Sequence, residues 1–307
     1  MPKASACQPA VLSAGTRFAL FLVLRCPAPE HARDVAAACA AVPRLAQRLG
    51  KGAPAAKLQV AVGFGAAFWD AVSPEIRPAR LRPFVSIGST GPHAPATGGD
   101  VFLHIKSNRP DLNLDLARNV LGPLEGKVRT GEEVLGIRYR DSRDLTGFID
   151  GTMNPRGKAR AQAAMIGAED PPFAGGSYVL AQRYVTDLKR WAALAVSEQE
   201  AIIGRRKRDS RELTQAPPTA HIRRAEIKDG NRELPIYRQS MPYGQASGEL
   251  GLYFVAYAKD PARFERMLHR MLGIAEDGHH DRLMEFTEAV SGATFFVPSV
   301  TVLRSLA

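Results

Sequence analysis

Short, dense apolar runs alternate with amphipathic or alanine-rich stretches along this chain, and the alternation occurs twice. In the first half, runs of strand length occupy 18–24, 58–64, 101–105 and 134–139, and helical stretches occupy 31–49 and 110–121. Because proline lacks the N–H that continues a helix, we expect an interruption of the first helix at Pro43.

The second half repeats this plan. Strand-like runs occupy 177–185, 251–258 and 293–297, and helical stretches occupy 188–203 and 261–272. Two β-α-β-β-α-β units, each ferredoxin-like, account for the order. We therefore predict an α+β fold of two ferredoxin-like domains, 16–140 and 141–307, that meet as in a dimeric α+β barrel. A flexible N-terminal tail, 1–15, is expected to precede them.

The composition is that of an ordinary globular protein, with 307 residues of which 45% are hydrophobic and 23% charged. No apolar run approaches the ~18 residues that a membrane helix requires, and the N-terminus has no secretory signal pattern. The three cysteines are an odd number at unpatterned spacing, which favours reduced thiols over a disulfide framework. We expect a cytoplasmic protein without membrane contact.

The net charge of +10 raises the question of a polyanionic partner. The densest basic cluster is Arg205-Arg206-Lys207-Arg208, and no nucleic-acid motif or interleaved aromatic residues accompany it. We therefore predict no nucleic-acid partner. The cluster is either a solvated surface or a place where cations meet an anionic cofactor or substrate.

The stretch 147–155 concentrates the strongest local signal for chemistry. Two glycines bracket Phe148, Ile149 and Asp150, and Asn154-Pro155 closes the segment as a turn. A solvated turn rarely contains two adjacent large apolar residues. Asp150 is thus a candidate acid/base group, and the alternative is an Asx turn in which the carboxylate bonds its own backbone.

Among the seven histidines, His221 follows the stiff segment Pro217-Pro218-Thr219-Ala220, which fixes its position. The competing metal signal is the cluster Glu276-Asp277-Gly278-His279-His280-Asp281. Adjacent side chains diverge on a helix or strand, and no i, i+4 histidine pair occurs. We therefore interpret the cluster as a polar helix entry that begins at Asp281.

Residues 147–151 resemble the GxxDG signature of dye-decolourising peroxidases, which are haem enzymes, and of their bacterial B-type branch in particular. Four further stretches agree in order and spacing: 100–107, 175–187, the His221 segment and 237–244. The similarity covers roughly 18–298. It implies the same pair of domains, with one haem b per chain held mainly by the second. No C-x-x-C-H motif occurs, so we expect non-covalent attachment.

The resemblance also assigns roles to single residues. It makes His221 the ligand of the haem iron, with Asp281 accepting the other imidazole N–H and Glu285 as the alternative acid. It makes Asp150 and Arg238 the catalytic pair on the peroxide side. The other implied haem contacts are Ile149, Gly151, Arg205, Ser240, Phe254 and Phe286, with Lys207 as the alternative to Arg205.

Two positions depart from the family pattern. Ser240 stands where some members have asparagine, and Met153 stands where many have glutamate. The hydroxyl of Ser240 can still order a water molecule. We therefore expect the chain to have peroxidase activity, with the fine tuning of the reaction altered. Met153 is expected on the rim of the pocket.

The implied function is oxidation of dyes, phenols or similar small aromatic reductants by hydrogen peroxide, through an oxoferryl intermediate. Trp69 and Trp191 are candidate electron relays, and the sequence singles out neither. A haem-handling, iron-releasing (deferrochelatase-like) protein is the alternative, because it would need the same His221 site. A haem-free nucleic-acid binder is the third. We also expect a homo-oligomer, and no C-terminal cargo tail for an encapsulating shell.

Overall fold

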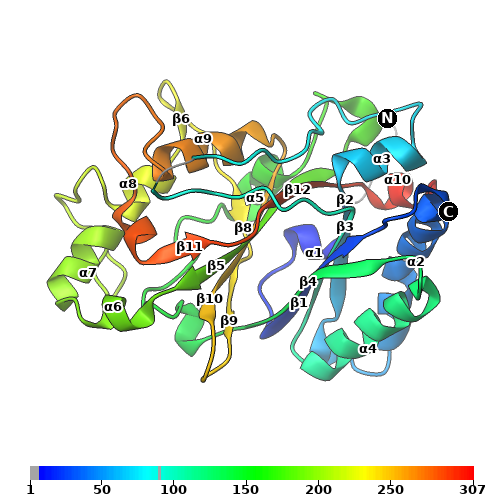
Figure 1. Cartoon of the computed structure of the whole chain (residues 1–307), viewed down its shortest axis with the longest axis horizontal. Helices are drawn as coiled ribbons and strands as arrows, with labels where there is room; N and C mark the ends of the chain where they lie inside the picture. Colours follow the sequence, from blue (N-terminus) through cyan, green and yellow to red (C-terminus); the bar gives the residue numbers. More distant parts are fainter. Residues whose placement is uncertain (1–6, 89–90) are drawn as a thin grey trace.

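The computed structural model describes residues 7–88 and 91–307, and the predicted element order occurs twice in it (Figure 1). The first half contains α1 (Pro9–Leu12), β1 (Phe18–Arg25), α2 (Ala32–Gly50), β2 (Gln59–Phe64), α3 (Ala66–Val72), β3 (Val101–Ser107), α4 (Pro110–Leu121) and β4 (Arg129–Ile137). The second half contains α5 (Gly157–Ala164), β5 (Ser177–Thr186), α6 (Leu188–Ala192), α7 (Val196–Ile203), α8 (His221–Ala225), β6 (Lys228–Asp229), β7 (Arg232–Glu233), β8 (Tyr237–Arg238), β9 (Met241–Gly244), β10 (Leu250–Ala258), α9 (Ala262–Met271), β11 (Thr287–Ala289), β12 (Ala293–Val297) and α10 (Val300–Arg304).

The two halves have the same antiparallel strand order. It is β2-β3-β1-β4 in the first half and β9-β10-β5-β12 in the second, so each half is a ferredoxin-like unit. Two seams join them, through the pairs Gly136–Tyr243 and Phe296–Phe64. Because β5 also pairs with β10, the eight strands form a closed ring. The predicted α+β fold and its barrel-like arrangement are confirmed.

Closure buries both faces of the central strands. In β1, Phe21 and Val23 point into the core of the barrel, whereas Leu22 and Leu24 pack outward with the buried faces of α2 and α4. Side chains of a strand alternate between its two faces, so a strand buried on both faces appears in sequence as a continuous apolar run. This is why the dense runs marked the strands.

The segment predicted as a flexible tail is partly folded. Gln8 is fully buried, and its Nε2 donates to Val62 O at 2.8 Å and to Pro298 O at 3.0 Å. Its Oε1 accepts from Val62 N at 2.7 Å, so one carboxamide completes β2 beside the seam with β12. The next residues form α1, and Val11 lies in the barrel core. The structure therefore differs from the tail prediction at Gln8 and in α1, and residues 1–6 lie outside the described part of the chain.

Helix α2 continues through Pro43, so the predicted interruption is also wrong. Proline removes one backbone donor, but Cys39, Val42 and Ala46 keep the apolar face of this helix in the core. At the other end of the chain, α10 packs on α2, and Figure 1 shows this last helix beside the first half. No helix of the described residues is both long and apolar enough to cross a bilayer.

The Gln8 clamp predicts that the N-terminal segment contributes to stability. Gln8→Leu leaves buried backbone groups of Val62 and Pro298 without partners, at a cost of about 1–3 kcal/mol for each group. We expect urea unfolding to show that loss in the free energy of unfolding. The control Gln245→Leu, on an exposed turn, should change it by less than about 0.5 kcal/mol. Equal effects of the two substitutions would show that the segment is dispensable.

Candidate active site

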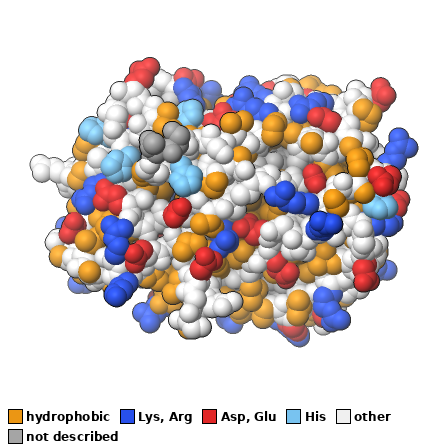
Figure 2. All heavy atoms as spheres, in the orientation of Figure 1, with side chains coloured by type: hydrophobic (Ala, Val, Ile, Leu, Met, Phe, Trp, Pro, Cys, Tyr) orange, Lys and Arg blue, Asp and Glu red, His pale blue; other side chains and the backbone are white. Residues whose placement is uncertain are grey.

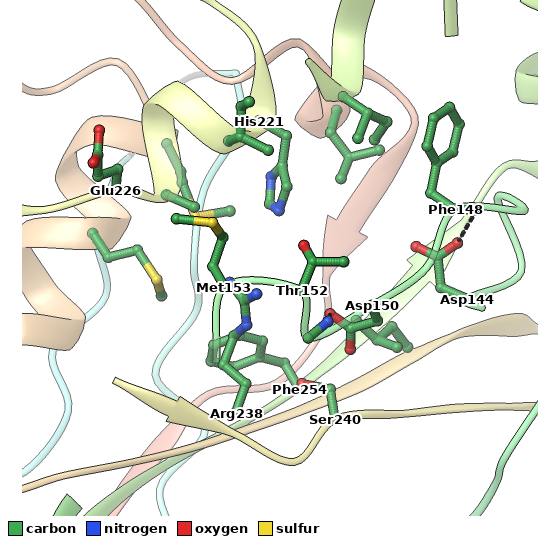
Figure 3. A pocket seen from close by; sticks show the side chains of 18 of the residues that line it. Asp144, Phe148, Asp150, Thr152, Met153, His221, Glu226, Arg238, Ser240 and Phe254 are labelled. Atoms are coloured by element: carbon green, nitrogen blue, oxygen red, sulfur yellow. Dashed lines mark hydrogen bonds between the residues drawn. The ribbon is translucent and has the colours of Figure 1, made fainter. Parts of the chain in front are cut away.

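A cavity lies on the outer face of the second-half strands, between the sheet and the helices α8 and α9 (Figure 3). Tyr184 and Thr186 of β5 and Leu252 and Phe254 of β10 contribute from the sheet. The opposite side and the rim are supplied by α8, α9, the short 3-10 turn Arg282–Glu285 and the loop 144–153. The lining is largely apolar, with a few polar side chains pointing inward.

His221 is the first residue of α8, and its imidazole points into the cavity (Figure 3). Its Nδ1 lies 2.6 Å from Oδ2 of Asp281, which is fully buried. Asp281 is itself fixed, because its Oδ1 accepts from Leu283 N at 2.9 Å at the start of the 3-10 turn. Nδ1 is thus the donor to a carboxylate, and Nε2 is left with its lone pair toward the cavity. Burial lowers the pKa of His221, but the charge and hydrogen bond of Asp281 outweigh it, so the net shift is upward.

The alternative acid, Glu285, is engaged elsewhere. Its Oε1 lies 3.1 Å from His280 Nε2 and 3.4 Å from Arg282 Nε. The rival metal cluster is likewise dispersed, because Asp277 forms a bidentate pair with Arg224 at 2.6 and 2.8 Å. In the part of the chain that the structure describes, no group of three or more His, Cys, Asp or Glu side chains could hold a metal ion.

Asp150 and Arg238 line the same cavity, and Figure 3 shows both on the side opposite His221. Asp150 lies on a loop that Gly147 and Gly151 allow, with φ of 91° and 74°. Its Oδ1 accepts from Gly151 N at 2.6 Å, as in the turn interpretation. The same carboxylate lines the cavity, as the acid/base interpretation requires. The two interpretations of Asp150 are therefore compatible.

The guanidinium of Arg238 has no partner in the part of the chain that the structure describes. None of its nitrogens makes a hydrogen bond or ion pair with the described residues, and its Nε is buried. The other arginine in the lining, Arg205, is engaged, since it donates to Ser210 O at 2.9 Å. Arg238 thus presents a fixed positive charge that the protein does not neutralise.

Asp144 is a further acid of the cavity, and its place there is not evident from the sequence. Its Oδ1 accepts from Thr146 N at 2.9 Å and Phe148 N at 3.3 Å, and also from the Thr146 hydroxyl. Burial, with the nearby charge of Asp150, raises the pKa of Asp144 to about 6 despite these bonds. A local sequence pattern does not reveal such burial.

Most of the other predicted haem contacts line the cavity as well. They are Ile149, Gly151, Arg205, Ser240 and Phe254. Met153 lies in the lining and is 51% exposed, as expected for a rim residue. Lys207 does not line it; its Nζ donates to Gln199 Oε1 at 2.5 Å.

Phe286, another predicted haem contact, lies beside the cavity. It is absent from the cavity lining and packs against Trp191, with ring centroids 5.3 Å apart, in a small cluster beside the site. The 3-10 turn that Asp281 begins ends at Phe286 and places its ring there. Trp191 also contacts Phe148, whereas Trp69 packs against Phe173 and Phe296 and does not line the cavity.

The donor set fits a haem. One partly buried imidazole offers Nε2 as an axial ligand, and a carboxylate holds the other nitrogen, as is usual at metal sites. The broad lining is apolar, which suits a macrocycle. Arg205 and Arg238 each have a buried Nε without a partner, which leaves hydrogen-bonding capacity for anionic groups.

The chain matches two family models, Dyp-type peroxidase, N-terminal, over residues 8–138 and Dyp-type peroxidase, C-terminal, over residues 141–302. It therefore belongs to the Dyp-type peroxidase family. It is 39% identical to the dye-decolorizing peroxidase of Mycobacterium tuberculosis over 299 residues, covering 95% of this chain and 88% of the relative. It is 40% identical to that of Rhodococcus erythropolis over 263 residues, covering 84% of this chain and 77% of the relative.

Solved structures agree. A variant of DypB from Rhodococcus jostii RHA1 in complex with heme is 40% identical, with a TM-score of 0.93 over 98% of this chain and 99% of that one. The dye-decolorizing protein from V. cholerae is 39% identical, with a TM-score of 0.92 over 97% and 99%. The family, the fold and the peroxidase function predicted from the sequence are confirmed.

The geometry predicts that His221 is needed for cofactor retention. His221→Ala removes the imidazole that lines the cavity, so the purified protein should lose haem or show a strongly shifted Soret band. His279→Ala and His280→Ala are matched controls outside the cavity and should leave haem content and spectrum unchanged. A normal spectrum for His221→Ala, or loss of haem in either control, would contradict the assignment.

Proposed function

We propose that this haem peroxidase binds its iron through His221 and reacts with hydrogen peroxide on the opposite side, between Asp150 and Arg238. The observation that carries the proposal is their arrangement: one cavity has a carboxylate-bound imidazole on one side and an acid with an unpaired arginine on the other. The cofactor is haem, held without a covalent bond.

When bound, the haem supplies a ferric iron that coordinates peroxide and takes up its oxidising equivalents. His221 would hold the iron with Nε2, while Asp281 accepts the Nδ1 proton and increases the electron density of the ring. Arg205, with its unpaired Nε, would bind a propionate, since guanidinium groups recognise carboxylates well. Phe254 and Ile149 would contact the macrocycle.

On the other side, Asp150 would take the proton from one peroxide oxygen and return it to the other, which then leaves as water. Arg238 would stabilise the negative charge that develops on the departing oxygen as the O–O bond breaks. The reducing substrates, which we propose to be dyes, phenols or similar aromatics, would return the two electrons one at a time.

A second cavity offers peroxide a way in. It shares Asp150, Gly151, Arg238 and Ser240 with the haem cavity. Its remaining lining is polar and basic in large part, with Lys106, Arg138 and Arg143 among its members. We propose that peroxide, a small polar molecule, enters there, which leaves the apolar cavity to the haem.

No observation favours the alternative functions. A haem-handling protein would need the same His221 site, and turnover of peroxide separates the two activities. On the face drawn in Figure 2, basic and acidic side chains are interspersed, without the basic stripe typical of a nucleic-acid binder. The homo-oligomeric state, the cytoplasmic location and the absence of a cargo tail stay predictions.

Asp281 should tune the iron without being needed to hold it. Asp281→Asn removes the negative charge beside His221 but leaves an acceptor for Leu283 N–H. We expect a higher Fe(III)/Fe(II) reduction potential and peroxidase activity lower by about 10–100-fold, the usual cost at such positions. Glu285→Gln is the control and should leave the potential unchanged, because Glu285 pairs with His280. Equal potentials in wild type and Asp281→Asn would reject the role.

Asp150 and Arg238 should differ in their effect on the pH dependence of the reaction with peroxide. Asp150 must be ionised to accept a proton, so the wild-type rate should fall in acid. Asp150→Asn should slow the reaction about 10²–10⁴-fold and remove that acid limb. Arg238→Leu should cost about 10²–10³-fold and keep the limb, since arginine does not titrate there. The measurement is the stopped-flow change of the Soret band at varied pH.

Asp144 is the necessary control, because its pKa is raised to about 6, so its own protonation could also produce an acid limb. Asp144→Asn should retain the acid limb if the limb belongs to Asp150. An acid limb that persists in Asp150→Asn and disappears in Asp144→Asn would transfer the proton-accepting role to Asp144.

A further inference from the structure

The side chain of Asn154 holds the backbone of Arg238. Arg238 N donates to Asn154 Oδ1 at 2.9 Å, and Asn154 Nδ2 donates to Arg238 O at 2.8 Å. The pairing joins residues 84 positions apart in the sequence. It links the loop that carries Asp150 to the short strand β8 that ends at Arg238.

This pairing completes an open sheet edge. Gln239 N donates to Val255 O of β10, so Arg238 occupies the neighbouring position and turns its N–H and C=O away from β10. The outer edge of β8 has no strand partner among the described residues, and the carboxamide of Asn154 takes the place of one. Gln8 makes the same pair of bonds with Val62 at β2.

We propose that Asn154 is a positioning residue for the reaction with peroxide, acting through Arg238. The inference rests on the proposed role of Arg238. Because the guanidinium makes no hydrogen bond or ion pair of its own with the described residues, its location depends on its backbone, and Asn154 holds that backbone from outside.

Asp150 does not depend on Asn154 in this way. Asp150 N donates to Ser142 O at 3.0 Å, within its own loop. Arg143 braces that loop by donating to Gly147 O and Lys207 O, each at 2.7 Å. Loss of the Asn154 side chain should therefore release Arg238 and leave Asp150 in place.

Hydrogen exchange of the backbone tests the clamp without haem or peroxide. In the apoprotein, Asn154→Ala should speed exchange of the Arg238 amide and leave the Asp150 amide protected. Asn108→Ala is the matched control: its carboxamide also joins two backbone segments, at Arg17 N and Ala55 O, and it lines neither cavity. It should leave Arg238 exchange unchanged. Unchanged Arg238 exchange in Asn154→Ala would overturn the proposal.

Kinetics of the holoenzyme test the function of the clamp. Misplacement of a catalytic group by about 1 Å can cost ~10²-fold, so Asn154→Ala should slow the reaction with peroxide by about 10–100-fold. The KM for the reducing substrate and the acid limb should stay as in wild type, because the bond from Asp150 N to Ser142 O keeps Asp150 in place. Asn154→Ser is a milder truncation and should slow the reaction with peroxide less. It replaces Asn154→Ala in this test if Asn154→Ala does not fold.

A double substitution tests whether Asn154 acts through Arg238. In an Arg238→Leu background, Asn154→Ala should cause no further fall in the rate with peroxide, since the group that it positions is gone. An additive fall, or a flattened acid limb in Asn154→Ala alone, would reject the route through Arg238. A lowered unfolding temperature with a wild-type peroxide rate would reduce Asn154 to a structural role. If Arg238→Leu itself reacts at the wild-type rate, the proposed function fails along with this inference.

Discussion

Closure of the eight strands into a ring is the constraint that decides where a cofactor can lie. The interior is filled by aromatic rings, such as Phe21 stacked on Tyr253 with centroids 4.3 Å apart and Phe102 on Phe295 at 5.3 Å. A macrocycle cannot enter such a packed core. In the first half, α2 and α4 cover the outer face of the strands, as Figure 1 shows. In the second half, an apolar cavity lies between the sheet and the helices α8 and α9.

The closed barrel of strands also brings the N-terminal helix α1 beside β8, the strand that ends at Arg238. Gln239, the next residue, donates to Ala10 O at 2.8 Å and Val11 O at 3.0 Å of α1, and it accepts from Lys106 Nζ. Burial and the charge of Arg160 lower the pKa of Lys106 to about 7, so this bond lies in a poorly solvated place. Strand β8 is thus braced by α1 through Gln239 and by Asn154 through Arg238. Two residues of strand would otherwise be a weak support for a catalytic group.

The sequence predicted those features of the fold and site that leave a pattern in neighbouring residues. Strands buried on both faces appear as apolar runs, and the Gly-bracketed loop marked Asp150 and Gly151 directly. Residue chemistry alone left His221 and Arg238 as candidates, and the family resemblance selected them. The acid beside His221 could be narrowed to two residues, and only the fold separates Asp281 from Glu285.

The features that the sequence did not reveal depend on distant pairings. Gln8 looks like a residue of a polar tail until Val62 and Pro298 are brought to it, and Asn154 looks like a simple turn residue until β8 lies beside it. Phe286 is a large apolar residue of the kind that lines haem pockets, but its ring packs against Trp191 at the end of the 3-10 turn Arg282–Glu285. Each of these outcomes involves a contact with a residue far away in the chain, and no local pattern encodes such a contact.

The unpaired guanidinium of Arg238 gives a reason for holding this residue by its backbone. A guanidinium with a buried Nε and no acceptor loses hydration without compensation, and an ion pair would be the usual remedy. The cavity contains acids, including Asp144, Asp150 and Glu226, yet none forms an ion pair with Arg238. A salt bridge would fix the side chain but would neutralise the charge that developing oxygen anions need. Holding the residue by its backbone fixes its place and leaves that charge available.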